Sequence, residues 1–106
     1  MVIMKNTNID GSKFYESRLS GADFLGAKMS NMRIDKSDLS ECSFVETNWE
    51  YTEVYDSNLS ESDFAYSEMR EVSFNKCEIY KSDFSKCELS KAKFIKSSMV
   101  KCRFIG

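Results

Sequence analysis

The chain has 106 residues, of which 42% are hydrophobic and 30% charged, with no Pro and no His; this is the composition of one small folded domain and excludes two domains or a disordered chain. Its 15 Lys and Arg nearly balance its 17 Asp and Glu, so the net charge of -2 indicates neither a nucleic-acid binder nor a membrane-surface protein. The longest apolar stretch is Met1 to Met4, so we expect no transmembrane helix and no signal peptide.

A five-residue repeat runs through the sequence. Every fifth residue is large and apolar, and we call these the core positions; so long a run is not expected by chance in a chain that is 42% hydrophobic. The core positions are Met4, Ile9, Phe14, Leu19, Phe24, Met29, Ile34, Leu39, Phe44, Trp49, Val54, Leu59, Phe64, Met69, Phe74, Ile79, Phe84, Leu89, Phe94, Met99 and Phe104. Two residues before each lies a small position, which is nearly always Ser, Thr, Ala or Cys. The other positions carry almost all of the charge, so we expect them to face water.

The period of five predicts a chain that turns a corner in every repeat. It matches neither the 3.6 residues of a helical turn nor the simple alternation of a long strand. Within one repeat the small and core positions point to one side, as in a very short strand, and the residue two after the core position, which we call the corner position, completes the turn. Four corners close a square coil, and coils stacked about 4.8 Å apart would pair their backbone groups with each other.

Residues 20 apart should then stack in columns, and the residue types support this register. One column holds Met4 and then only Phe, namely Phe24, Phe44, Phe64, Phe84 and Phe104. Another holds Leu19, Leu39, Leu59, Ile79 and Met99. Stacked rings stabilise each pair by about 0.5 to 1.5 kcal/mol beyond area burial, which explains why Phe is kept in one column.

With this pattern the sequence resembles the pentapeptide-repeat family, whose repeat is a small residue, a polar one, Leu or Phe, and two variable ones. Ala22–Gly26 and Ser37–Glu41 match it closely, as do Ser62–Phe64 and Ser82–Phe84, and the match covers essentially the whole chain. The resemblance implies an all-β fold, a right-handed quadrilateral β-helix solenoid of about five coils, as a single domain over residues 1–106. It also implies that the small and core positions fill the interior.

The corner positions change in character along the chain. Gly or Asn occupies several in the first third, and Glu, Lys, Tyr or Asp occupies the later ones. Gly and Asn tolerate the positive φ of a type II turn. We therefore expect type II corners in the first third and more turns of other types later, without positive φ throughout Glu41 to Lys101.

No pattern points to catalysis, a metal site or a cofactor. His, the commonest general base, is missing, and the serines mostly occupy small positions, where a hydrogen bond to the backbone is the expected role. The cysteines Cys42, Cys77, Cys87 and Cys102 also occupy small positions. Cys42 and Cys102 share a column but lie three coils, or roughly 14 Å, apart, which is too far for a disulfide. We expect four reduced interior thiols, no enzymatic activity and a cytoplasmic protein.

Charge is uneven along the predicted coil axis. Residues 42–61 contain five acidic residues and no Lys or Arg, and they form a candidate acidic interaction surface: Glu46, Glu50, Glu53, Asp56 and Glu61. Residues 82–101 contain five Lys against Asp83 and Glu88, which gives a net charge of +3. Solubility, and lysines that protect an exposed coil end from aggregation, would explain the same charges without any partner.

The resemblance implies two functions for such a coil. The first is a non-enzymatic, rigid, rod-like module for protein interaction or structure. The alternative is a DNA mimic that binds a type II topoisomerase (DNA gyrase) and modulates it or protects it from quinolones, as some members of the family do. Five coils span roughly 24 Å, over which duplex DNA carries on the order of 14 negative charges, whereas this chain has a net charge of -2. We expect no direct nucleic-acid partner and no membrane partner.

The ends of the repeat carry no recognisable cap. A bare terminal coil exposes apolar side chains and unpaired backbone groups, so we expect two copies to stack end to end as a two-fold homodimer. The candidate interface is the C-terminal set Phe94, Ile95, Met99, Val100, Phe104 and Ile105. The neighbouring lysines oppose this pairing, and a cut through a longer solenoid would leave the same bare end.

Overall fold

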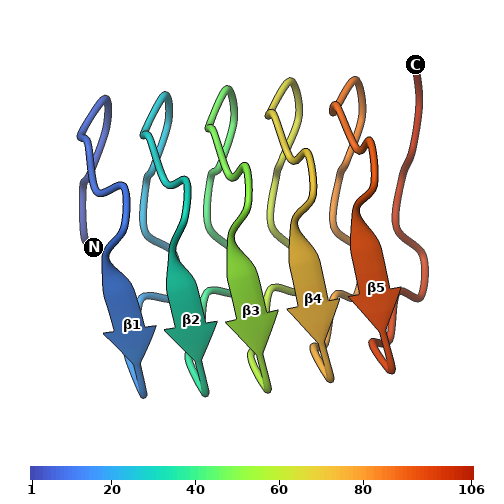
Figure 1. Ribbon diagram of the computed structural model, residues 1–106, viewed down its shortest axis with the longest axis horizontal. Helices are drawn as coiled ribbons and strands as arrows, with labels where there is room; N and C mark the ends of the chain where they lie inside the picture. Colours follow the sequence, from blue (N-terminus) through green and yellow to red (C-terminus); the bar gives the residue numbers. More distant parts are fainter.

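The computed structural model describes residues 1–106 and shows a right-handed coil of short parallel strands without any helix (Figure 1). The five strands are β1 (Lys13–Tyr15), β2 (Arg33–Asp35), β3 (Glu53–Tyr55), β4 (Ser73–Asn75) and β5 (Lys93–Ile95). They form one parallel sheet in sequence order, and paired residues are 20 apart, as Phe14 is with Ile34. The predicted all-β solenoid with a 20-residue coil is confirmed.

The strands occupy one of the four sides of the coil, which we call the strand side. The other three sides pair residue by residue in the same register, through single bridges such as Asp23 with Ser43, Asn48 with Glu68 and Asn58 with Glu78. We name these the Phe side, the Trp side and the Leu side after Phe44, Trp49 and Leu59 on the third coil. In chain order a coil runs through the Phe, Trp, strand and Leu sides.

The core positions fill the interior of the coil. From Phe24 to Phe84 all of them are buried. Within the Phe column, Phe44 and Phe64 stack with ring centroids 5.0 Å apart and Phe64 and Phe84 with centroids 4.7 Å apart, as the sequence predicts. Burial decreases toward both ends, and Phe104 is 53% exposed because no further coil lies over it.

The corner positions contradict the expectation of mixed turn types. All of them have positive φ, including Glu41 at 55°, Glu61 at 57° and Lys101 at 60°. The backbone of the following coil dictates this conformation, since corner N–H groups donate to it, as Glu61 does to the carbonyl of Tyr80 at 2.7 Å. Stacking, rather than the preference of the residue, therefore determines φ at a corner.

The molecule is as wide as it is tall. Its principal extents are 26, 25 and 23 Å, so the stacked coils form a squat block and not the elongated rod that a solenoid suggests. No helix in the structure is long and apolar enough to cross a membrane.

Candidate interaction surfaces

The hydroxyl groups inside the coil connect one coil to the next. Ser62 Oγ donates to the carbonyl of Leu39 at 2.9 Å and accepts the N–H of Cys42 at 3.2 Å. Ser82 makes the same pair of bonds, to the carbonyl of Leu59 at 2.7 Å and from the N–H of Ser62 at 3.2 Å. The small-position serines thus bond to the backbone, as the sequence predicts. Ser67 Oγ also lies 3.3 Å from Cys87 Sγ, and none of these serines bonds to an Asp, Glu or Lys side chain.

The thiol groups have the same kind of partner. Cys42 Sγ donates to the carbonyl of Leu19 at 3.1 Å, and Cys102 Sγ to that of Ile79 at 2.7 Å. Burial raises the pKa of Cys42 and of Cys77 to about 11, so both remain neutral thiols at physiological pH. All four cysteines are free; Cys42 and Cys77 are buried, while Cys87 and Cys102 are half-buried. No group of three or more Cys, Asp or Glu side chains is placed to hold a metal ion.

The surface has three shallow grooves, each following a row of corners. The largest, about 640 Å³, lies between Tyr51, Glu71 and Lys91 at the corner and the strand side, with Val72 and Ala92 lining it. The other two, about 540 and 530 Å³, follow the corners after the Phe side and after the strand side. Since the interior is filled with side chains, these grooves are the only hollows in the molecule.

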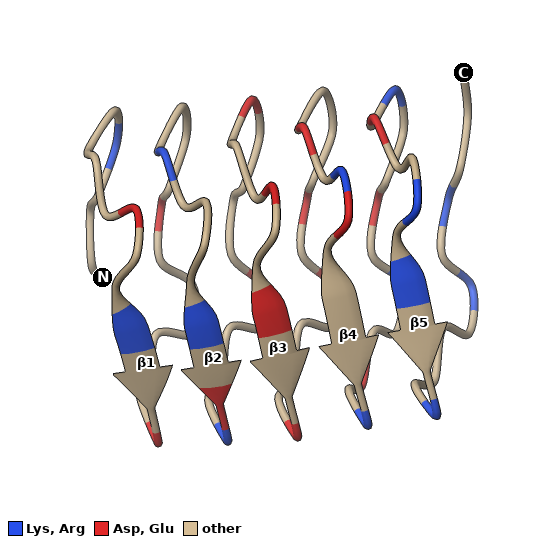
Figure 2. Cartoon of the chain, viewed as in Figure 1, with Lys and Arg blue, Asp and Glu red and all other residues tan.

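The five acidic residues of the third coil do not form one surface. Glu46 and Asp56 are at the corners after the Phe and strand sides, Glu53 lies on β3, Glu50 is on the Trp side and Glu61 is at the corner after the Leu side. They therefore encircle the coil. Glu50 is also paired with Arg70 of the next coil, Oε2 to Nη1 at 3.3 Å. Figure 2 shows a red segment on β3, between β2, which carries one blue and one red segment, and the uncharged β4.

A different set of acidic residues does lie together. Glu41 and Glu61 are successive corners after the Leu side, and Asp63 and Asp83 pair directly on the adjoining Phe side. This acidic edge follows the axis over several coils, whereas the five residues chosen by sequence segment follow the circumference. Reading the sequence in columns of 20 residues, instead of by segments, would have found it.

The basic end of the molecule has a lysine at each corner of the last coil. The four are Lys86, Lys91, Lys96 and Lys101. Lys86 lies over the ring of Tyr66 and Lys101 over that of Tyr80, with Nζ 5.5 and 6.0 Å from the centroids.

The six residues of the candidate end-to-end interface all lie in this last part of the chain, but they point in different directions. Phe94 and Met99 pack against the interior core, Phe104 stacks on Phe84, and these three form the open coil end. Ile95, Val100 and Ile105 follow core positions and therefore face outward on three different sides, with exposures of 44%, 53% and 55%. Only the first three lie together on the end of the coil.

Comparisons with known proteins agree with this architecture. A family profile described as "Pentapeptide repeat region" matches residues 17–94. Among solved structures, HetL, a pentapeptide repeat protein involved in heterocyst differentiation regulation from the cyanobacterium Nostoc sp. PCC 7120, superposes with a TM-score of 0.73 at 23% identity, over 92% of this chain and 39% of HetL. A trypsin-treated variant of QnrB1, a plasmid-mediated fluoroquinolone resistance protein, gives 0.77 at 17% identity, over 95% of this chain and 57% of that one.

Rfr23, a pentapeptide repeat protein from the cyanobacterium Cyanothece 51142, gives a TM-score of 0.59 at 13% identity, over 96% of this chain and 86% of its own length. Comparison with curated protein sequences finds no match. At such identities these likenesses concern the fold. The chain also spans only part of HetL and of QnrB1.

Proposed function

Since this chain belongs to the pentapeptide-repeat family, we propose that it is a non-enzymatic, rigid module that presents surface side chains to a protein partner. One observation carries the proposal: the interior is solid, and the backbone of all four sides is tied to its neighbours in one register. Outward side chains are thereby held at fixed spacings of about 4.8 Å along the axis. A surface of this kind loses little conformational entropy on binding.

A non-enzymatic role is supported by the chemistry of the polar groups. The interior hydroxyls and thiols are engaged with backbone groups of neighbouring coils. The grooves are shallow, and no nucleophile in them is hydrogen-bonded to a base. The free interior thiols also support a reducing compartment, and we propose the cytoplasm.

A DNA mimic that acts on a topoisomerase is the second candidate, and the acidic edge of Glu41, Glu61, Asp63 and Asp83 is the observation that favours it. The net charge of -2 and the basic last coil oppose it, because duplex DNA is negative along its whole length. A supercoiling assay with purified DNA gyrase separates the two candidates. We expect no effect of this protein on the enzyme, with or without a quinolone; inhibition or protection that is lost in the variant Glu61→Lys/Asp63→Lys would favour the mimic.

The interaction role is tested by quantitative affinity capture with the wild type and with a variant altered only on its surface. The variant Glu41→Lys/Glu61→Lys reverses two exposed corners and leaves every core position unchanged. We expect the wild type to retain a partner protein. This variant, or a matched variant on another side of the coil, should fail to retain it although the melting temperature of the variant is unchanged. Equal capture of all proteins by every variant would contradict a specific module.

We also propose that two copies associate end to end through the open coil end of Phe94, Met99 and Phe104. Its support is the exposed apolar surface there, with Phe104 53% exposed and Ile105 beside it 55% exposed. The substitution Ile105→Asp should lower the solution mass from dimer to monomer by light scattering. Phe104→Asp, on the open end itself, should do the same, and an unchanged mass in both variants would show that this end is not the interface.

A further inference from the structure

The strand side has a pattern of charge that is complementary to itself. Its outward residues before the core position are Glu53 on β3, Ser73 on β4 and Lys93 on β5, and the strand pairing places Glu53 and Lys93 one coil to either side of Ser73. Figure 2 shows the same order, with β3 acidic, β4 uncharged and β5 basic. A half-turn about an axis along β4 exchanges the positions of Glu53 and Lys93. Glu53 of each copy would then face Lys93 of the other copy, which gives two pairs of opposite charge.

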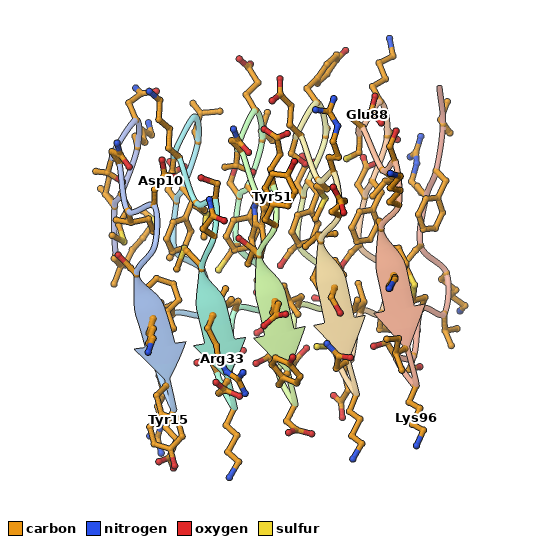
Figure 3. The ribbon with its side chains drawn as sticks, viewed as in Figure 1. Asp10, Tyr15, Arg33, Tyr51, Glu88 and Lys96 are labelled. Atoms are coloured by element: carbon orange, nitrogen blue, oxygen red, sulfur yellow. The ribbon has the colours of Figure 1, made fainter.

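The other outward rows of the strand side follow the same rule. The corner residues after the strands are Asp56 on the third coil and Lys96 on the fifth, so they also exchange with opposite charge. Tyr51 and Lys91, at the corner before the strands, exchange as an aromatic ring and a cation. Figure 3 shows Tyr51 at one end of this side and Lys96 beyond the other end.

The fourth row supplies apolar contact. Tyr55 on β3 and Ile95 on β5 stand in one row, separated by Asn75 on β4. Ile95 is 44% exposed. Arg33 holds the ring of Tyr55 in place, with its guanidinium carbon 4.3 Å from the ring centroid, and Asp35 anchors Arg33 through Oδ2, 2.8 Å from Nε.

We propose that the strand sides of two copies of this chain pack face to face about a two-fold axis along β4, with their coil axes antiparallel. In this arrangement Glu53 faces Lys93 of the other copy, Asp56 faces Lys96, and Tyr55 faces Ile95. The proposal is independent of end-to-end stacking, because it uses a side of the coil and not its end.

Electrostatics selects this arrangement over its alternatives. A two-fold axis parallel to the coil axis, over the middle of this side, would exchange its two outward rows. Glu53 would then face Tyr55 and Lys93 would face Ile95, so neither charge would meet an opposite one. An axis along β2 would bring Lys13 against Glu53. It would also bring Glu16 against Asp56 and would place Arg33 against itself at the centre of the patch.

With the axis along β4, the strand residues that meet their own copies, Ser73 and Asn75, are uncharged. The corners Glu71 and Lys76 also meet their own copies, at the two edges of the patch, and this like-charge contact weakens the association.

The area of the patch makes the association weak and sensitive to salt. Three strands about 4.8 Å apart, each with about five residues per side, present a flat surface of roughly 15 by 15 Å, well below the about 800 Å² per partner of a standard interface. Exposed charge pairs are screened within about 8 Å at physiological ionic strength. Self-association should therefore appear at high protein concentration and low salt, and weaken as salt is added.

Charge reversal tests the arrangement by sedimentation equilibrium in low salt. Glu53→Lys and Lys93→Glu should each weaken self-association by about tenfold or more, because each places like charges face to face. The double variant Glu53→Lys/Lys93→Glu should restore it, because the two-fold pairs the two positions with each other. As a matched control, Glu61→Lys, Lys101→Glu and their double variant reverse the same residue types on the same two coils. Both residues lie at the corner after the Leu side, diagonally opposite the corner of Glu71.

The results that overturn the proposal are distinct from a failure of the end-to-end dimer. A wild type that remains monomeric at high concentration in low salt, a double variant as weak as the single ones, or an equal response of the Glu61 and Lys101 series would each contradict it. Ile105→Asp should leave this association unchanged. As a second readout, Ser73→Cys should be linked into dimers by a short bismaleimide reagent and Ser98→Cys, on the Leu side, should not; equal linking of both would also contradict the two-fold along β4.

Discussion

At the scale of single residues, the polar residue before a core position supports the backbone. A carboxylate or amide oxygen there accepts the N–H of the residue two further on, as in Asp63 with Ala65 at 3.0 Å, Asp38 with Ser40 at 3.0 Å and Asn48 with Glu50 at 2.9 Å. On the strand side regular ladder pairing runs through that residue, and the position holds Lys, Arg, Glu or Ser instead. Asp and Asn thus occur where the ladder leaves an N–H free.

The substitution Asp63→Ala tests this backbone role. It should lower the free energy of unfolding by about 0.5 to 1.5 kcal/mol, the usual net contribution of one hydrogen bond, and Asp63→Asn should recover most of the loss. Glu53→Ala, at the equivalent position of the strand side, should change stability by less than about 0.5 kcal/mol. Urea unfolding measures all three, and equal losses for Asp63→Ala and Glu53→Ala would argue against the assignment.

The buried thiols predict a loss of stability at alkaline pH. Desolvation raises the pKa of Cys42 and Cys77 to about 11 in the folded chain, whereas an unfolded thiol ionises near about 8.5. Since the thiol pKa is higher in the folded chain, the stability that the neutral thiols contribute is complete below the unfolded pKa. It is lost as pH rises from the unfolded pKa to the folded pKa. The wild type should therefore lose more stability than Cys42→Ala/Cys77→Ala between about pH 8.5 and 11. Parallel profiles in urea would mean that these thiols are not buried.

At the scale of an element, the Phe column acts as a continuous stack through the coil. Its centroid spacings stay between 4.7 and 5.2 Å from Phe24 to Phe104, and Trp49 packs edge-on against Phe44 at 4.9 Å. Phe64 is fully buried and Phe104 is 53% exposed. Phe64→Ala should cost about 3 to 5 kcal/mol, and Phe104→Ala, with the same change of residue in the same column, much less. Equal midpoints in urea for the two variants would contradict the stack.

The corners are a second kind of element, and they differ in hydrogen bonding while sharing the same sign of φ. At some corners a backbone N–H donates directly to the carbonyl of the core residue three positions before it, as Thr52 does to Trp49 at 3.0 Å across Tyr51. At others a side-chain oxygen of the next coil lies between the two groups, as Ser62 Oγ does between Leu39 and Cys42. Both kinds leave a side chain in the left-handed region.

A glycine substitution at a corner should therefore be stabilising. Glu61→Gly removes the cost of a left-handed residue, about 1 to 2 kcal/mol, against an entropy cost of about 0.5 to 1 kcal/mol, and should raise stability slightly. Glu53→Gly, within β3, should lower it by about 0.5 to 1 kcal/mol. Opposite shifts of the two melting temperatures are expected, and a loss at Glu61 as large as that at Glu53 would contradict the corner geometry.

At the scale of the whole molecule, the fold could be predicted from the sequence because residues 20 apart occupy equivalent positions on successive coils and are of similar type. Phe at positions 20 apart predicts the register, and Ser, Ala and Cys at the small positions predict which side chains face inward. The φ of residues such as Glu61 could not be predicted, because stacking overrides the local preference. The acidic edge of Glu41, Glu61, Asp63 and Asp83 was missed because charge was counted by chain segment, although a surface on a coil follows its columns.

The 20-residue register is the claim on which the fold and both proposed interactions depend, and disulfide formation in Arg33→Cys/Glu53→Cys tests it most directly. These two residues are paired on β2 and β3, about 4.8 Å apart, which is within reach of a disulfide, and both are exposed. Mild oxidation should join them within one chain. In the control Arg33→Cys/Asn58→Cys, the second cysteine lies on the next side of the coil, so the same oxidation should not form a disulfide. Equal bridging of the two pairs, or bridging of the control alone, would contradict a square coil of four five-residue sides.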